Sequence, residues 1–236
     1  MGRSNFQFKQ FNIEQDQCAM KVTTDASLFG AWVARSADTL ENILDIGAGT
    51  GLLSLMLAQS SSARVHAVEI EKDCFGQLQE NICNSPFSKQ IDKFHHDIKT
   101  FDIGARYDLI ISNPPFHQDQ LRSGQSNVDL ARHDAGLILP ELLGICSALI
   151  KEKGSIFILL PYYRKNECQN IAEELGWRAV RSATVRHSIK HEPFRVMFQF
   201  SQNAAEIHEE EIIIHDDNGH YTTGFADLLR PYYLHL

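Results

Sequence analysis

The chain has 236 residues, of which 43% are hydrophobic, and a formal net charge of −8 at pH 7. This length fits a single α/β domain that can bury its own core. No stretch approaches the roughly 18 unbroken apolar residues of a membrane span. The first residues, Met-Gly-Arg-Ser-Asn-Phe, contain no apolar segment that would indicate a signal peptide. The composition therefore predicts a cytoplasmic protein that does not enter a membrane.

Cysteine and histidine usage argues against a metal site. The five cysteines are scattered and never spaced as Cys-x-x-Cys: Cys18, Cys74, Cys83, Cys146 and Cys168. This usage predicts reduced thiols, with neither disulfides nor zinc. The eleven histidines show no ligand spacing either, and the adjacent His95 and His96 would point to opposite faces of a strand.

The charges are segregated along the chain. Five Lys or Arg and one acid lie between Arg178 and Arg195, whereas six acids and no Lys or Arg lie between Glu206 and Asp217. Because salt screens exposed charges beyond about 8 Å, such local patches matter more than the net charge. The net negative charge therefore does not exclude a nucleic-acid partner. We expect the acidic stretch to be a solvated surface that lies away from such a partner.

Runs of β-branched residues alternate with helical stretches, which is typical of a parallel sheet wrapped by helices. Aromatic residues between Phe6 and Ile13 predict a small N-terminal hairpin, followed by a helix at Ser27–Ala34 that Thr24 or Asp25 caps. Strands are expected at Ile43–Gly47, Arg64–Ile70, Lys93–Asp97, Tyr107–Asn113, Ser155–Pro161, Val180–His187 and Arg195–Ser201. Helices are expected at Leu52–Gln59, Cys74–Cys83, Glu141–Lys151 and Asn166–Leu175.

The C-terminal third departs from this alternation. The connection Ser188–Pro193 is too short for a crossover helix, so the strands on either side of it should pair antiparallel. Asp217-Asn218-Gly219 is a strong hairpin signal, and Thr223–Tyr233 reads as a short helix broken at Pro231. We expect one domain with three parts: a hairpin and helix at 1–35, a core at 36–201, and a hairpin and short helix at 202–236.

A glycine-rich loop follows the first core strand. Gly47, Gly49 and Gly51 open a helix, so the backbone can approach a ligand closely at the helix N-terminus. A dinucleotide site would need its third glycine at position Leu52, and no Lys-Ser/Thr follows as in a P-loop. Asp45, just ahead of the glycines, adds an acceptor for a ligand's amino group.

Acidic residues end the next two strands. Glu69 ends the second strand, where its carboxylate can bind both hydroxyls of a ribose, although it could be an ordinary acid at a strand end. Asp97 ends the third strand and could accept a hydrogen bond from an adenine amino group. Its alternative role is that of a turn or cap residue.

The run Asn113-Pro114-Pro115-Phe116 ends the apolar stretch Tyr107–Ser112. The Asn113 side chain and the Pro114 carbonyl can accept hydrogen bonds from both N–H groups of a planar amine, the prolines stiffen the turn, and Phe116 offers a face for stacking. Such a run could also be structural punctuation. In a doubly wound sheet, however, the first and fourth strands flank the ligand crevice, which would place this run beside the glycine loop.

The order of Asp45–Gly51, Glu69, Asp97 and Asn113–Phe116 resembles that of the class I S-adenosylmethionine-dependent methyltransferases. The resemblance implies a Rossmann-like α/β fold with a seven-stranded, mostly parallel sheet, an antiparallel last strand and flanking helices. It implies S-adenosylmethionine as the cofactor, with the methionine moiety at the glycine loop, the ribose at the second-strand acid and the adenine at the third-strand acid. The residues after those acids, Ile70 and Ile98, would line the same site, and Asn113 would contact the cofactor as well as the amine.

Three further features resemble the bacterial tRNA(Val) adenine-N6 methyltransferases, which modify the adenosine on the 3′ side of the anticodon. They are the segment Phe11–Ala26, Ala131-Arg132-His133-Asp134, and the tail Tyr221–Leu234. The resemblance implies a tRNA substrate, and it places Lys21 and Thr24 beside the cofactor, with a helix cap as the alternative. Arg132 and His133 would approach RNA phosphate or else form a solvated face. The expected tRNA-binding stretch, alternatively a plain strand edge, contains Arg178, Arg181, Arg186, Lys190 and Arg195.

Other readings stay open at this point. Enzymes that methylate a guanine amine in ribosomal RNA share the string Ser112–His117, but many carry an additional RNA-binding half that this chain lacks. Enzymes that methylate protein glutamine usually have Tyr where Phe116 stands. An inactive cofactor-binding fold that serves as an RNA-binding module is the alternative outside enzymes, and the intact glycine loop and Asn113 argue against it.

Overall fold

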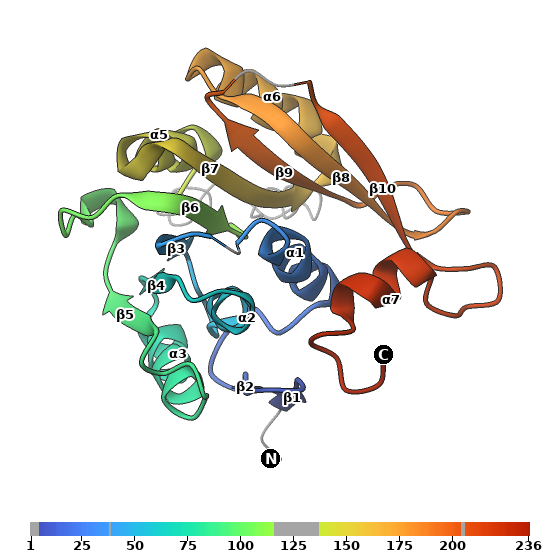
Figure 1. The fold of residues 1–236 in the computed structure, drawn as a ribbon, viewed down its shortest axis with the longest axis horizontal. Coiled ribbons are helices and arrows are strands. Elements are labelled where there is room, and N and C mark those ends of the chain that lie inside the picture. Colours follow the sequence, from blue (N-terminus) through green and yellow to red (C-terminus); the bar gives the residue numbers. More distant parts are fainter. Residues whose placement is uncertain (1–4, 38, 116–136, 204–205) are drawn as a thin grey trace, which may run out of the picture.

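The computed structural model describes residues 5–37, 39–115, 137–203 and 206–236, and within these ranges its centre is an eight-stranded sheet (Figure 1). The strands are β3 (Asn42–Ile46), β4 (Arg64–Glu69), β5 (Ile91–His95), β6 (Tyr107–Ser112), β7 (Ile150–Pro161), β8 (Arg178–Ser188), β9 (Arg195–Ser201) and β10 (His208–His215). Their spatial order is β10-β8-β9-β7-β6-β3-β4-β5. The order reverses between β3 and β6, so the expected crevice lies at the carboxyl ends of these two strands.

Strand β9 runs antiparallel to both of its neighbours, β7 and β8, and the other pairs are parallel. The expected Rossmann-like sheet with an antiparallel strand is therefore confirmed, and it has one strand more than the seven expected. The extra strand, β10, pairs parallel with β8 and buries Ile212 and Ile214. The turn at Asp217–Gly219 forms, but the chain beyond it pairs with β10 only through the bridge between His215 and Tyr221. The expected C-terminal hairpin is thus reduced to one bridge.

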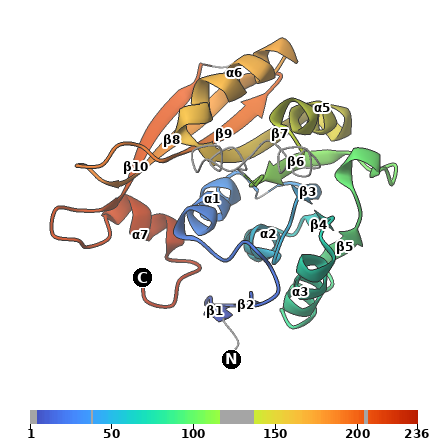
Figure 2. The same ribbon diagram turned by 180° about the vertical axis from the view of Figure 1, so that it is seen from behind.

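Helices cover both faces of the sheet, as Figures 1 and 2 show. On one face lie α1 (Thr24–Ala34), α2 (Leu52–Ser60), α3 (Lys72–Cys83) and α7 (Thr223–Leu229), and on the other lie α5 (Leu139–Leu149) and α6 (Lys165–Glu174). Successive strand residues supply the two cores in turn: Ile43 packs with the first set of helices and Leu44 with the second.

The cap of α1 was predicted wrongly, because Thr23 Oγ1 accepts from Ala26 N at 3.4 Å and takes that role.

The N-terminal hairpin has the expected antiparallel form, with β1 (Asn5–Gln7) paired to β2 (Asn12–Glu14). It lies beside the C-terminal segment of the chain. Phe8 forms a bridge with Tyr233, Lys9 N donates to Tyr232 O at 2.7 Å, and Lys9 Nζ donates to Arg230 O at 2.6 Å. The two ends of the described chain are therefore held together.

The prediction that all five cysteines are reduced thiols is wrong, because Cys18 and Cys74 form a disulfide. The segment before α1 is held against α3, where Gln77 Oε1 accepts from Gln17 N at 3.0 Å and from Cys18 N at 3.1 Å. The sequence separation of 56 positions between the two cysteines hides this proximity in the sequence. Burial raises the pKa of the free Cys168 thiol to about 12.

The described residues show neither a metal-binding cluster nor a membrane-spanning helix. Within those ranges, no group of three or more His, Cys, Asp or Glu side chains is arranged to hold a metal ion. The helices of the same ranges include none with the length and apolar character needed to cross a membrane.

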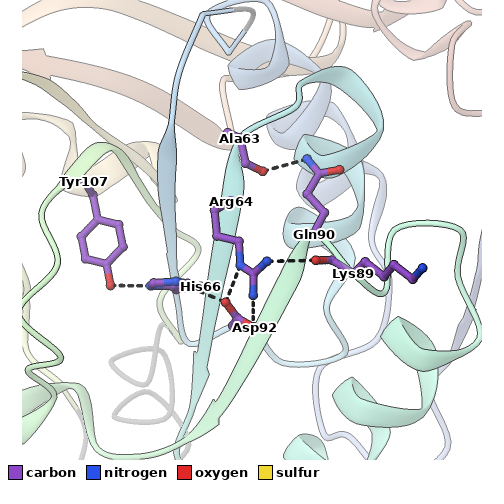
Figure 3. Close-up of polar contacts among 7 residues, drawn as sticks. All are labelled: Ala63, Arg64, His66, Lys89, Gln90, Asp92 and Tyr107. Atoms are coloured by element: carbon purple, nitrogen blue, oxygen red, sulfur yellow. Dashed lines mark hydrogen bonds and ion pairs between the residues drawn. The ribbon is translucent and has the colours of Figure 1, made fainter.

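A polar cluster in which His66 and Tyr107 are buried and Arg64 is exposed joins β4, β5 and β6 near their amino ends (Figure 3). The Nδ1 atom of His66 lies 2.9 Å from the hydroxyl of Tyr107, and its Nε2 lies 3.5 Å from Asp92 Oδ2. Arg64 donates to both carboxylate oxygens of Asp92. Burial lowers the pKa of His66. This cluster lies at the amino ends of the strands, whereas the glycine loop lies at their carboxyl ends. Its polar groups form hydrogen bonds and ion pairs with one another.

Candidate functional site

The glycine loop leaves the carboxyl end of β3 and enters α2. Gly47, Gly49 and Gly51 have φ values of 69°, 55° and 87°, in the left-handed region that favours glycine. A Cβ at position 51 would lie 2.8 Å from Leu78 Cδ1, whereas a Cβ at position 47 would meet nothing within 4 Å. Gly51 therefore permits close packing of the loop onto α3, and the side of the loop at Gly47 is open.

Asn113 lies beside this loop because β3 and β6 are neighbours in parallel register, with Ile46 opposite Ser112. A shallow recess of about 50 Å³, here called the glycine pocket, lies between them. Its lining is formed by Met20, Lys21, Val22, Ala26, Gly47, Ala48, Gly49, Thr50, Leu52, Leu53 and Asn113. The structure thus brings together the two motifs that sequence reasoning placed on either side of one crevice.

The side chain of Asn113 carries the most informative polar atom of the pocket. Its Oδ1 is buried and has no hydrogen-bond partner among the described residues. Its Nδ2 lies 3.8 Å from the sulfur of Met20. A buried acceptor without a donor costs about 1–3 kcal/mol, so a ligand N–H group at this place would relieve that cost. Pro114, which follows, is buried, and Pro115 is exposed.

Asp45 is completely buried beneath the loop and is not among the residues that line the pocket. Its Oδ2 accepts from Ser54 Oγ at 2.6 Å, and its Oδ1 has no partner within the described part of the chain. Burial raises the pKa of Asp45 to about 7, and the hydrogen bond from Ser54 opposes this rise. In this structure Asp45 ties the end of β3 to α2.

Glu69 ties the carboxyl end of β4 to the glycine loop. Its Oε2 accepts from Gly49 N at 2.8 Å, and its Oε1 accepts from Glu71 N at 2.8 Å. The side chain is largely buried. Each carboxylate oxygen has two lone-pair sites, so both can accept a further hydrogen bond from a ligand.

Asp97, the acid that ends the third predicted strand, is a cap residue in the structure, which is the alternative role given for it above. Asp97 Oδ1 accepts from Lys99 N at 2.9 Å and caps the short 3-10 helix Ile98–Thr100. Ile98 is buried in the core, whereas Ile70 is 60% exposed. Strands β4 and β5 are parallel, with Glu69 opposite His95, so these residues line the same edge of the sheet as the glycine loop.

The two polar residues expected at the start of α1 lie on different sides of it. Lys21 lines the glycine pocket, but Thr24 lines a second pocket together with Asp25. Sequence reasoning missed Met20 and Val22, which flank Lys21 in the glycine pocket. Their position beside Lys21 in the segment before α1 was the available signal.

Three of the expected site residues, Phe116, Arg132 and His133, lie outside the described residues. The roles expected for them in base stacking and phosphate contact stay predictions.

The expected RNA-binding stretch is paired with the acidic stretch. Among its residues, Arg181 lies 3.4 Å from Glu210, Arg186 lies 2.6 Å from Glu211 and Lys190 lies 2.9 Å from Asp217. Arg195 Nε donates to Asp25 Oδ2 at 2.6 Å, and Arg178 begins β8 at the edge of the sheet opposite to Asn113. Five of the six acids are exposed, as expected for a solvated surface, and Glu210 is half-buried. The sequence did not indicate that β10 places Glu209, Glu210 and Glu211 beside β8.

Comparisons with known proteins agree with this fold. The model of the methyltransferase small domain matches residues 28–135. A predicted O-methyltransferase from Agrobacterium tumefaciens superposes with a TM-score of 0.68 at 14% identity, over 87% of this chain and 95% of that chain. The glycopeptide N-methyltransferase MtfA, in complex with S-adenosylmethionine, superposes with a TM-score of 0.57 at 9% identity, over 79% of this chain and 97% of that one. At these identities the likeness shows the fold alone.

Full-length relatives are more specific. The tRNA1(Val) (adenine(37)-N6)-methyltransferase of Dyadobacter fermentans is 39% identical over 98% of each chain. The enzyme of that name from Parabacteroides distasonis is 36% identical over 99% of each chain, and the one from Escherichia coli is 36% identical over 98% of this chain and 96% of that protein. This chain belongs to the family of the tRNA1(Val) (adenine(37)-N6)-methyltransferases.

Proposed function

We propose that this protein transfers a methyl group from S-adenosylmethionine to the exocyclic 6-amino group of an adenosine in tRNA, namely the adenosine on the 3′ side of the anticodon of a valine tRNA. Family membership supports the choice of substrate. The structural observation that carries the proposal is the buried Oδ1 of Asn113, which lacks a donor among the described residues and belongs to the glycine pocket. The N–H group of an amine is a donor that would satisfy it.

The residues at the edge of the sheet fit the proposed cofactor. The open side of the loop at Gly47 can receive a ligand's polar groups, and Glu69 keeps free lone pairs for hydroxyl donors. The glycine pocket has a volume of only about 50 Å³, which is too small for the whole of S-adenosylmethionine. The cofactor would therefore extend beyond this pocket, along the carboxyl ends of the strands, toward Glu69 and Asp97. S-adenosylmethionine supplies, when bound, an electrophilic methyl group on a positively charged sulfur.

The protein's part in the reaction is to orient the amine and stabilise its developing charge. The lone pair of an aromatic amine is delocalised into the ring, which makes the nitrogen a poor nucleophile. Hydrogen bonds from its two N–H groups to the Asn113 side chain and the Pro114 carbonyl favour positive charge on that nitrogen and fix its direction. No strong base is needed, because the nitrogen becomes far more acidic after it gains the methyl group and then releases its proton to water.

The adenine has to leave its stack to reach such a site. Unstacking a base costs a few kcal/mol, and stacking on an aromatic side chain returns about 1–3 kcal/mol. We propose Phe116, which follows Pro115 in the sequence, as the residue that provides this face.

The test uses valine tRNA transcribed without modification and a second transcript in which the target adenosine is replaced by guanosine. Each is incubated with the protein and S-adenosylmethionine labelled in the methyl group, then digested to nucleosides. We expect label in N6-methyladenosine from the first transcript and none from the second. Label in a methylated guanosine, or no label in tRNA, would contradict the proposal.

A further inference from the structure

A second pocket lies on the other side of the first turn of α1. Its volume is about 210 Å³. Six of the residues that line it carry polar or aromatic groups: Thr24, Asp25, His187, Phe194, His215 and Tyr221. Ligand pockets for drug-sized molecules have roughly 300–1,000 Å³. The smaller volume therefore suits one planar ring system.

Parallel pairs of rings form much of this lining. The rings of His187 and Phe194 are stacked with centroids 4.0 Å apart and an interplanar angle of 5°. The rings of His215 and Tyr221 are stacked at 5.0 Å and 24°, and Tyr221 also stacks on Phe225 at 4.7 Å and 28°. Tyr221 nevertheless remains 46% exposed. Packing thus fixes the orientation of its ring while leaving part of the ring accessible.

The charges of the pocket are compatible with RNA. The carboxylate of Asp25 is bound by Arg195 at 2.6 Å, and the guanidinium of Arg195 lies 5.5 Å from the centroid of the Phe194 ring. The negative charge of Asp25 is thereby neutralised. His215 Nδ1 donates to His187 O at 3.3 Å. Thr24 is an exposed residue, and its hydroxyl can hydrogen-bond to the edge of a base.

The second pocket and the glycine pocket share α1 as a boundary. Ala26 lines the glycine pocket, whereas Thr24 and Asp25 line the second pocket. Figures 1 and 2 show α1 between α2, which follows the glycine loop, and α7, which follows Tyr221. His187 and His215 lie near the carboxyl ends of β8 and β10, the edge of the sheet at which β6 delivers Asn113. One RNA strand can therefore reach both pockets across the start of α1.

We propose that the second pocket binds a base that flanks the methylated adenine in the same RNA, with Tyr221 and the His187–Phe194 pair as its stacking surfaces. This inference rests on the proposed function, because the RNA is the proposed substrate. Proteins recognise single-stranded RNA loops by stacking splayed bases on Phe, Tyr, Trp or His. The second pocket thus gives the enzyme a way to select the nucleotides around its target.

The test compares Tyr221→Ala with Tyr221→Phe, which keeps the ring, and with Leu175→Ala, which removes a similarly exposed apolar side chain beyond α6. We expect Tyr221→Ala to raise the KM for valine tRNA about tenfold, with kcat nearly unchanged. The two controls should stay within about twofold of the wild type. Equal melting temperatures for the variants would establish that all of them are folded.

A second series uses the wild-type protein with tRNA in which each nucleotide next to the target is made abasic in turn. One abasic position should raise the KM about tenfold, and it should have no further effect on Tyr221→Ala. A wild-type KM for Tyr221→Ala, additive effects, or no sensitive abasic position would overturn the inference while the proposed function stands. If the wild type methylates no adenosine in tRNA, both fail.

Discussion

Two buried polar atoms near the glycine loop lack hydrogen-bond partners among the described residues, whereas charged side chains between β8 and β10 form ion pairs. Beside the loop, Asn113 Oδ1 and Asp45 Oδ1 are buried without partners among the described residues. Between the two strands, Glu210 accepts from Trp32 Nε1 at 2.6 Å and lies 3.4 Å from Arg181. A buried polar group without a partner is costly, so beside the open glycine loop it favours binding of a ligand that supplies the missing donor. The paired groups between β8 and β10 stabilise the contact between these two strands and are not left available to bind a ligand.

The largest effect is expected at the unpaired amide. Asn113→Ala removes an acceptor that we propose acts on the amine, and loss of one such group costs roughly 10²–10³ in kcat. The affinity for S-adenosylmethionine should change little. Single-turnover methylation and calorimetric titration of the cofactor measure the two quantities. Met20→Leu, which alters the neighbour of the amide but keeps the acceptor, is the matched control. Equal losses of turnover and cofactor affinity in Asn113→Ala would make Asn113 a structural residue.

The second prediction concerns the pH dependence of stability at Asp45. The folded pKa of about 7 is above the ordinary aspartate pKa of 3.8, so the contribution of Asp45 to stability is fully present below pH 3.8 and is lost as the pH rises through 7. Asp45→Asn lacks this loss. Because one pKa unit corresponds to about 1.4 kcal/mol, the stability of the variant relative to the wild type should rise by a few kcal/mol across this range.

Urea unfolding at several pH values measures this difference for Asp45. A constant difference between Asp45→Asn and the wild type from acid to neutral pH would show that Asp45 titrates normally in the folded protein. It would also remove the contrast between this carboxyl, whose Oδ1 has no partner among the described residues, and the paired carboxylates of β10.

The third prediction uses the satisfied cluster at the opposite edge of the sheet (Figure 3). Tyr107→Phe leaves His66 Nδ1 without its partner, which should cost about 1–3 kcal/mol of unfolding free energy. Turnover per folded molecule should be unchanged, because the cluster lies away from the glycine pocket. A loss of kcat in Tyr107→Phe without a loss of stability would show that this region takes part in function.

The smallest effect is expected for an ion pair between β8 and β10. Arg186 and Glu211 are partly exposed and 2.6 Å apart, so a double-mutant cycle with Arg186→Gln and Glu211→Gln should give a coupling of about 0.2–1 kcal/mol. The affinity for tRNA should change little in Arg186→Gln, because the charge is already paired. If that variant lost tRNA affinity while the coupling was zero, Arg186 would belong to the RNA-binding surface instead.

The parts of the fold that short stretches of sequence determine could be predicted. The alternation of β-branched runs and helices identified the core, and the short connection Ser188–Pro193 identified the antiparallel pair. Strand β10 was hidden because Glu209–Glu211 reads as solvated surface until the basic side chains of β8 are placed beside it. The disulfide between Cys18 and Cys74 was hidden for a similar reason, since only the hairpin and α3 bring these residues together.

The part of the candidate site that could be predicted lies where neighbouring parallel strands end at the same side of the sheet. That geometry brought Asn113 beside the glycine loop without any information from side chains. The geometry of strand ends does not determine on which side of α1 a residue lies. The resemblance placed both Lys21 and Thr24 beside the cofactor, whereas in the structure Lys21 lines the glycine pocket and Thr24 lines the second pocket. Strand-end geometry also does not indicate that Glu69 binds the backbone of Gly49.

The most direct test of the central claim counts N6-methyladenosine, by mass spectrometry, in valine tRNA after single-turnover reaction with the wild type and with Asn113→Ala. A parallel transcript carries purine riboside, which lacks the 6-amino group, at the target position. We predict one methyl group at the target adenosine with the wild type, at least about a hundredfold slower transfer with Asn113→Ala, and none to purine riboside. Transfer to purine riboside, or wild-type rates from Asn113→Ala, would contradict the account.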